Sequence, residues 1–295
     1  MDKNKEIQSW WNENPFTYNG SYGVGKVVEI KDMDIAFFDL MERKYKKHSN
    51  GSTQNAEEPV FSKFVPYESL RGKRVLDIAT GTGFSTVAFA KAGAEVTGID
   101  LTNFAVQSTK KNFEVRNLQA TILQMDAQAL EFPDNSFDYV CAHGCLMHMP
   151  DTEKAISEIF RVLKPGGEVY AWMYHRGWRY WFGIMFIRGF LLGGFFRYGF
   201  SSLAMTSRYS DGAHEGGNPH TKFYSRGGFK NLFAKGKLVD VEVYANYNPS
   251  EWQAWPLQSI NLGRFIPKGV QRFLSEKAGF AYACSIVAKK PTLAK

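Results

Sequence analysis

The chain has 295 residues, of which 44% are apolar, so it can form one large domain or two small ones around a buried core. Its three cysteines argue against a disulfide framework and fit a reducing compartment, and its formal net charge of +7 mildly favours anionic partners. The charged opening, MDKNKEIQSWWNENP, does not resemble a signal peptide, so we expect a cytoplasmic protein.

The first 70 residues combine an aromatic cluster with one long polar stretch. Trp10, Trp11, Phe16 and Tyr18 lie close together in the sequence, and we expect them to pack against the core. The stretch HSNGSTQNAEEP, from His48 to Pro59, has the composition of a surface loop.

An apolar run then ends in Asp77, and a Gly81–Thr82–Gly83 turn leads into a helical pattern at Phe84. A strand, a tight turn and a helix start in this order bring backbone N–H groups close to a ligand. No Gly-Lys-Ser/Thr follows, which excludes a P-loop, and Thr86 replaces the small third residue of the dinucleotide motif. A carboxylate at Asp77 would repel a pyrophosphate and attract a cationic ligand.

A second strand pattern, AEVTGID, ends in another acid, Asp100. An acid at this position can accept hydrogen bonds from both hydroxyls of a ribose. The two strand ends together predict a nucleoside-cofactor pocket at the C-terminal edge of a parallel sheet.

Strand and helix patterns alternate from about residue 74 to 173, which is typical of βαβ units. Pro165 cannot continue a helix, so Gly166 and Gly167 should form the turn into the fifth strand. We expect strands at 74–79, 94–100, 119–125, 137–143, 167–173, 238–246 and 281–288, and helices that include 102–117, 152–163 and 226–235.

Four segments agree in order and spacing with a known family: VLDIATGTGFST, the strand ending in Asp100, TILQMDAQALEFPDNSFDYV and VLKPGGEVYAWM. Over about residues 70–175 the chain resembles the class I S-adenosylmethionine-dependent methyltransferases, close to the type 11 group that includes the quinone methyltransferases. The family usually has glycine where this chain has Ala79.

This resemblance implies an α/β fold with a Rossmann-like, doubly wound, seven-stranded sheet whose last strand is antiparallel. It also implies a helical lid and loop at 1–70 and a core at 71–174, 225–247 and 281–290. The two remaining segments, 175–224 and 248–280, are assigned to an inserted substrate cap.

The cofactor implied by the resemblance is S-adenosyl-L-methionine. The segment with Asp77, Gly81 and Gly83 would wrap its methionine part, Asp100 would take the ribose and Asp126 would lie near the adenine amino group. The full set of expected cofactor-binding residues is Asp77, Ala79, Thr80, Gly81, Thr82, Gly83, Asp100, Leu101, Met125, Asp126, Ala127 and His143.

The methyl group of this cofactor is already activated, so the protein mainly aligns the reactants and excludes water. A base is needed only if the acceptor loses a proton, and His143, His148 and His175 are the candidates because they follow strand ends. Each of them could equally shape the pocket.

Five residues are expected to line the substrate pocket: Trp11, Tyr18, His148, Tyr174 and Tyr224. Trp11 and Tyr18 have an alternative role, which is to close over the sulfonium by cation–π attraction.

Cys141, His143, Cys145 and His148 are metal-ligand types close together in the sequence. No second ligand pair supports them, so we expect no metal.

The segment from Trp178 to Phe200 is apolar and aromatic, and no acid lies between Glu168 and Asp211. Arg188 within the apolar run and the Gly193–Gly194 break argue against a membrane span and favour short helices over the pocket. Peripheral docking on an anionic membrane, or contact with an apolar substrate, stays open as a further role.

We therefore expect methyl transfer to a small, aromatic or lipid-like acceptor, with O-methylation favoured over N- or C-methylation. The alternative is a membrane-associated or partner-binding protein that keeps the cofactor fold without turnover. No nucleic-acid partner is expected, because the basic residues are scattered and HGCL replaces the base-flipping motif after the fourth strand.

Overall fold

The computed structural model describes residues 2–15, 28–48, 57–209, 217–246 and 265–292. Within these ranges seven strands form one sheet in the order β3-β2-β1-β4-β5-β7-β6. The strands are β1 Arg74–Ile78, β2 Glu95–Asp100, β3 Thr121–Gln124, β4 Phe137–His143, β5 Leu163–Tyr174, β6 Val239–Ala245 and β7 Ala283–Lys289.

The central strands are parallel, and β7 runs antiparallel to both of its neighbours, β5 and β6. The strand order reverses between β1 and β4, so right-handed crossovers place the connecting helices on opposite faces of the sheet. This arrangement confirms the predicted fold class, and the reversal lies between β1 and β4, where sheets of this kind bind ligands at the C-terminal strand ends.

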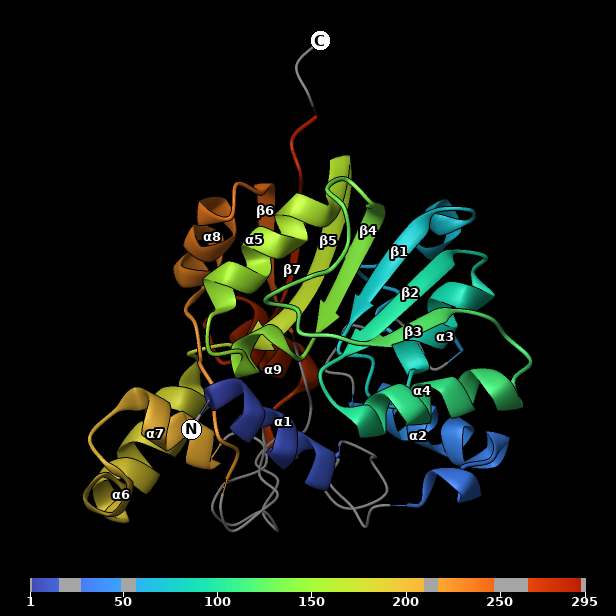
Figure 1. Cartoon of the computed structure of the whole chain (residues 1–295). Coiled ribbons are helices and arrows are strands. Elements are labelled where there is room, and N and C mark those ends of the chain that lie inside the picture. Colours follow the sequence, from blue (N-terminus) through green and yellow to red (C-terminus); the bar gives the residue numbers. More distant parts are fainter. Residues whose placement is uncertain (1, 16–27, 49–56, 210–216, 247–264, 293–295) are drawn as a thin grey trace.

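Four of the described helices connect the strands, and three of the four begin where a polar side chain caps the first turn. The four are α3 Phe84–Lys91, α4 Asn103–Val115, α5 Thr152–Val162 and α8 Arg226–Lys235. Thr102, Asp151 and Ser225 each accept a hydrogen bond from a backbone N–H in the turn that follows. In Figure 1, α5 and α8 cover the near face of the sheet.

The strand β5 begins earlier than predicted, at Leu163 rather than at residue 167. Leu163 already pairs with Phe137, and the register then shifts before Glu168 pairs with Tyr139. Gly166 lies in this irregular stretch with φ +77°. The predicted turn therefore exists, but as a bulge inside the strand, because β4 offers pairing groups on both sides of it.

The N-terminal part covers the C-terminal edge of the sheet. Helix α1 Lys3–Glu13 donates from Gln8 to the Leu101 carbonyl, and Asn12 accepts from the Phe104 N–H. Helix α2 Ile35–His48 is tied to α4 by an Asp39–Arg116 ion pair, and the short helices η2 Ile30–Asp32 and η3 Tyr67–Leu70 complete this part. Figure 1 shows α1 and α2 beyond the arrowheads of the central strands.

The cap segment forms three consecutive helices, namely η5 Arg179–Leu191, α6 Gly194–Tyr198 and α7 Ser202–Tyr209. Gly193, with φ +71°, separates the first two, as the Gly193–Gly194 break predicted. The first helix has the wide turns of a π-helix, which the sequence did not indicate.

The second cap segment is described only from residue 265, and it contains α9 Lys268–Glu276. Its earlier part, 248–264, lies outside the described residues, as do residues 49–56 of the expected polar loop. Of the helices in the described ranges, none is long and apolar enough to cross a membrane.

Candidate cofactor and acceptor site

The loop that follows β1 is held in a left-handed conformation at three of its five residues. Ala79, Gly81 and Gly83 have φ of +62°, +57° and +81°. A Cβ on Gly81 would meet no protein atom within 4 Å, whereas one on Gly83 would lie 2.9 Å from Thr109 of α4. Gly83 therefore permits close packing, and Gly81 leaves room beside the loop for a ligand.

Ala79 also explains why this family usually has glycine at its position. A non-glycine residue with positive φ is strained by about 1–2 kcal/mol. The Ala79 N–H donates to the Ile99 carbonyl at 2.8 Å, which holds the strained residue against β2.

The Asp77 side chain bonds the first turn of the helix that follows the loop. It is almost fully buried, and its Oδ2 accepts hydrogen bonds from Ser85 at 2.8 Å and Thr86 at 2.7 Å. Burial raises the pKa of the Asp77 carboxyl to about 6, and the two hydroxyls partly oppose this shift. Thr86, which departs from the dinucleotide motif, thus has a defined partner, and Asp77 fixes the start of α3 beside the loop.

Asp100 joins the end of β2 to the glycine loop. Its Oδ1 accepts from the Thr102 N–H and hydroxyl, both at 2.9 Å, and its Oδ2 accepts from the Gly81 N–H at 3.2 Å. Burial raises the pKa of Asp100 above its ordinary value, and these hydrogen bonds oppose the shift. The Asp100 carboxylate therefore lies beside Gly81 of the glycine loop.

Asp126 lies beyond the end of β3 and is bonded to the N-terminal helix. Its Oδ2 accepts from Asn4 Nδ2 at 2.8 Å, and its Oδ1 accepts from the Gln128 N–H at 2.8 Å. The Gln128 amide also donates to Asn4 Oδ1 at 3.1 Å. Sequence reasoning missed Asn4, because no local pattern links it to Asp126, 122 residues away, and it also missed Gln128, two residues after Asp126.

The remaining predicted cofactor residues lie along the same edge and act largely through the backbone. The Leu101 carbonyl accepts from Gln8 and Gln124, and the Met125 N–H donates to the Asp100 carbonyl at 2.9 Å. The Thr80 hydroxyl accepts from Thr109, while Thr82 and Ala127 are buried.

His143, at the end of β4, is enclosed by aromatic rings. Its ring stacks on Phe61 at a 4.0 Å centroid distance and on Trp172 at 5.0 Å. Its Nε2 lies 2.5 Å from the Tyr45 hydroxyl and its Nδ1 lies 3.2 Å from the Tyr170 hydroxyl. Burial lowers the pKa of His143 to about 3, so the ring is a very weak base and does not suit the predicted catalytic role.

His148, in the short helix η4 Leu146–His148, has a different environment. Its Nδ1 lies 3.1 Å from the His220 carbonyl and 3.0 Å from the Thr221 hydroxyl, and that hydroxyl donates to Asn218. Because the carbonyl can only accept, Nδ1 must carry the hydrogen, and the lone pair of the neutral ring is on Nε2. The tautomer is therefore the one that a proton acceptor at Nε2 requires.

Two predicted substrate residues contact the His148 ring. Trp11 of α1 lies edge-on to it at a 5.2 Å centroid distance, and Tyr174 of β5 does so at 5.9 Å. The structure thus brings together three of the predicted pocket residues from distant parts of the chain. Tyr18 lies outside the described residues.

His175 and Tyr224 lie on the side of the sheet that α8 covers. His175 Nδ1 bonds the Ala281 carbonyl at 3.1 Å, and both rings are near Phe229 of α8. Burial lowers the pKa of His175. The Tyr224 hydroxyl donates to Thr152 at 3.1 Å. These contacts give both residues structural partners away from Trp11 and His148.

Comparison with known proteins gives one family match and many relatives. Residues 76–171 match the family model described as "Methyltransferase domain". The demethylmenaquinone methyltransferase of Thermus thermophilus is 40% identical over 99 residues, which cover 33% of this chain and 45% of that protein. The phosphatidylethanolamine N-methyltransferase of Cereibacter sphaeroides is 33% identical over 135 residues, which cover 44% of this chain and 66% of that protein.

Residues 76–171 therefore carry a class I S-adenosylmethionine-dependent methyltransferase domain. This confirms the family and the cofactor class that the sequence motifs predicted. The matched segment spans about half to two thirds of these two relatives.

A solved structure shows the same fold over most of the chain. It is the methyltransferase in the complex "between the Haloferax volcanii Trm112 methyltransferase activator and the putative methyltransferase". The likeness has a TM-score of 0.56 at 17% identity and covers 89% of this chain and 96% of that one.

The residues along this edge fit S-adenosylmethionine. Asp100 and Asp126 offer carboxylate acceptors along one edge, beside a loop where Gly81 leaves open space. S-adenosylmethionine presents ribose hydroxyls and an adenine amino group, which are hydrogen-bond donors, so the acceptor-rich edge matches it.

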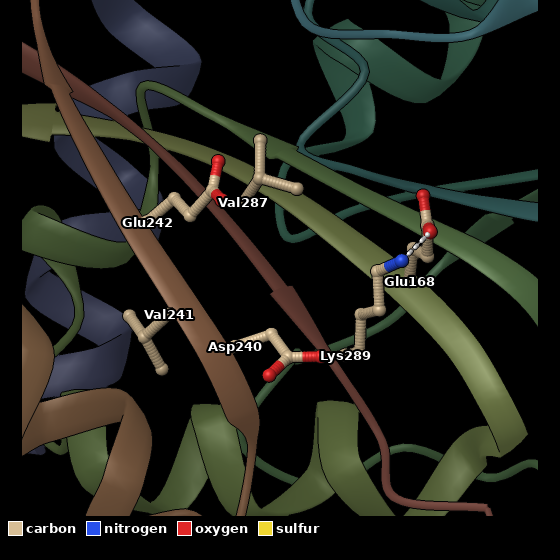
Figure 2. Close-up of a pocket in the computed structure, with 6 residues that line it drawn as sticks. All are labelled: Glu168, Asp240, Val241, Glu242, Val287 and Lys289. Carbon is tan, nitrogen blue, oxygen red and sulfur yellow. Dashed lines mark ion pairs between the residues drawn. The ribbon is translucent and has the colours of Figure 1, made fainter.

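Two other candidate sites in the described part of the chain give no evidence of a ligand. No group of three metal-ligand side chains converges there, and Cys141 and Cys145 are buried with free thiols. A hollow of about 480 Å³ lies over β5, β6 and β7. The residues that line it, drawn in Figure 2, are Glu168, Asp240, Val241, Glu242, Val287 and Lys289. Its charged groups include a Lys289–Glu168 ion pair at 2.8 Å, and none of the predicted site residues lines it.

Proposed function

We propose that the chain transfers a methyl group from S-adenosylmethionine to a small, aromatic or lipid-like acceptor. The observation that carries this proposal is the ring cluster of Trp11, His148 and Tyr174 on the same strand-end edge as the carboxylates of Asp100 and Asp126. One subsite thus offers acceptors to a nucleoside, and the other offers apolar surface and a nitrogen base.

Each part of the chain has a defined task in this proposal. The cofactor supplies a methyl group that its sulfonium already activates. Asp100 and Asp126 hold the nucleoside in place, and Trp11 and Tyr174 exclude water from an apolar acceptor. His148 Nε2 accepts a proton where the acceptor must lose one.

The tautomer of His148 is the reason to favour a hydroxyl acceptor. A phenol or enol becomes a good nucleophile on losing its proton, and a positioned base contributes about 10²- to 10⁴-fold to such steps. N-methylation and C-methylation remain alternatives, and the relative from Cereibacter sphaeroides is named an N-methyltransferase. Phosphatidylethanolamine, which is part of that name, is a lipid and supports an apolar acceptor.

A lipid-like acceptor also supports a peripheral contact with an anionic membrane, where such a molecule would be concentrated. A binding protein without turnover is the competing function. The intact carboxylates and the defined His148 tautomer favour the enzyme.

Release of S-adenosylhomocysteine tests the proposal. The chain is incubated with S-adenosylmethionine and a hydroquinone, phosphatidylethanolamine vesicles or a sterol, and the methylated atom is located in the product by NMR. We expect one acceptor class to yield one methylated product per S-adenosylhomocysteine released. Binding of the cofactor with no release in any arm would favour the protein without turnover.

The role of His148 is tested by two matched variants, His148→Gln and His175→Gln. Each removes a buried imidazole whose Nδ1 bonds a backbone carbonyl at 3.1 Å. For a hydroxyl acceptor, His148→Gln should lower kcat by about 10²- to 10⁴-fold. His175→Gln should lower Tm and leave kcat largely unchanged. Equal loss of kcat in both variants would assign His148 a structural role.

A further inference from the structure

We infer that the cap carries a docking surface for an anionic lipid membrane, formed by the outer side of η5 and by α6. This inference rests on the proposed function, because a lipid-like acceptor is what gives a membrane-docking surface its purpose. The surface itself is defined by exposed rings and charges that take no part in cofactor binding.

The outer side of η5 carries a ladder of aromatic rings. Trp178, Phe182, Phe186 and Phe190 recur every fourth residue, and their ring centroids are 4.5, 5.7 and 6.1 Å apart. All three pairs are stacked, with interplanar angles of 12°, 26° and 17°. The rings therefore form one continuous strip.

This strip is open to solvent and continues onto the tip of the cap. Phe190 and Leu192 are 65% and 66% exposed, and Phe196 and Phe200 around α6 are 81% and 74% exposed. Figure 1 shows α6 and α7 at the edge of the molecule, away from the sheet. Protruding apolar side chains of this kind can enter a lipid layer without moving the core.

The exposed area is larger than folding requires. Trp178, Trp181, Phe182, Phe186 and Phe190 are between 39% and 65% exposed. With about 200 Å² on each residue, these five alone present roughly 500 Å² of apolar surface. The largest apolar patch on a typical monomer is about 300–600 Å² and is often functional.

Positive charge accompanies the strip. Arg176 and Arg197 are exposed, and Arg197 lies between Phe196 and Phe200 at the tip. The sequence has no acid from residue 169 to 210. Exposed Lys268 and Lys277 add charge on α9, which adjoins the ladder where the Trp178 N–H bonds Gly279. On η5 and α6, rings and leucines next to arginine without acids match the interface of an anionic bilayer. The one acid of α9, Glu276, is paired with Arg272.

The positive charges of the docking surface argue against a second copy of the chain as its binding partner. A two-fold interface through the tip would place equivalent surfaces, each with Arg197, against one another. Like charges at the centre of such an interface cost several kcal/mol. An anionic surface instead gains from each arginine.

The back of this surface leads to the acceptor site. Tyr180, on the inner side of η5, lies 5.6 Å from Phe223, which stacks on Tyr174 at 5.0 Å. Tyr174 in turn contacts the His148 ring. Docking through η5 and α6 would therefore hold the acceptor site close to the lipid.

Vesicle co-sedimentation of the full chain tests the inference without any methyl transfer. The vesicles contain phosphatidylcholine alone or with 30% phosphatidylglycerol. We expect binding to the anionic vesicles, at least tenfold weaker binding to the neutral ones, and loss of binding as salt is raised. The double variant Phe190→Ser/Leu192→Ser should weaken anionic binding at least tenfold.

The matched control is Ile35→Ser/Leu40→Ser, which removes two exposed apolar residues from α2. It should leave vesicle binding unchanged. Affinity for S-adenosylhomocysteine should stay unchanged in both double variants, and this readout shows separately whether the cofactor site of the proposed function is intact.

Three outcomes would overturn the inference. Equal binding to neutral vesicles would remove the role of charge, and equal loss in the α2 control would remove the role of the strip. Sedimentation that shows a dimer lost in Phe190→Ser/Leu192→Ser, with no lipid binding by the parent chain, would assign the surface to a second copy.

Discussion

Replacing Asp100 by asparagine isolates one charge at the centre of the cofactor site. In the structure Oδ1 accepts two hydrogen bonds from Thr102, and Oδ2 accepts from the Gly81 N–H at 3.2 Å. Asparagine can keep the Thr102 pair through its oxygen, but its NH₂ group then faces the Gly81 N–H. The variant should fold while it loses the acceptor beside the loop.

The expected loss of cofactor affinity follows from the loss of this one charged hydrogen-bond acceptor. A hydrogen bond to a charged group contributes about 1.5–3 kcal/mol, so the affinity for S-adenosylhomocysteine should fall about 10- to 150-fold. Isothermal titration calorimetry measures it directly. Burial raises the pKa of Asp100. Protonation therefore begins at a higher pH than for an ordinary aspartate, so the difference between parent and variant should shrink as the pH is lowered.

Asp138→Asn is the matched control. Its carboxylate lies near the start of β4, at the opposite edge of the sheet, and accepts from the Arg74 N–H at 2.9 Å and from Lys164 at 2.8 Å. It should lower stability and leave the affinity unchanged. A parent-like affinity in Asp100→Asn, or an equal loss in Asp138→Asn, would refute the placement of the ribose.

Two further predictions concern the loop and its support. Gly81→Val and Gly72→Val place a side chain at φ +57° and +68°, where neither would meet a protein atom within 4 Å. Both variants should lower stability by about 1–2 kcal/mol through backbone strain. Only Gly81→Val should abolish S-adenosylhomocysteine binding. Loss of binding in Gly72→Val as well would show a general folding defect. The second concerns Asp77, whose pKa lies near 6 in the fold and near 3.8 unfolded. A raised carboxyl pKa stabilises the protonated fold, so stability relative to Asp77→Asn should fall by up to about 3 kcal/mol as the pH rises from about 4 to 7. Denaturant unfolding across this range measures the change, and a flat difference would contradict the buried, shifted carboxyl.

The sequence predicted the parts of this protein that are set by local pattern. The strand before Asp77, the turn at Gly81 and Gly83, and the acid at Asp100 all occur within short segments. Their periodicity and turn chemistry fixed both the fold class and the edge where the site lies. The break at Gly193 was predictable for the same reason.

Other features depend on contacts between distant segments and left no local signal. Asn4 reaches Asp126 only because α1 crosses the ends of the strands. The rings around His143 come from Phe61 and Trp172, and their burial removes the basicity that its place after a strand suggested. His148 lies in the same short stretch of sequence as His143. The feature that distinguishes it is its hydrogen bond to the His220 carbonyl, which comes from a distant segment.

The central claim is that the strand-end edge near Gly81 and Asp100 binds the cofactor of a methyltransferase. Calorimetric titration of the unmodified chain with S-adenosylhomocysteine, with NAD titrated in parallel, tests it most directly. The account predicts one-to-one binding of S-adenosylhomocysteine and no heat from NAD. Tight binding of NAD with no response to S-adenosylhomocysteine would contradict it.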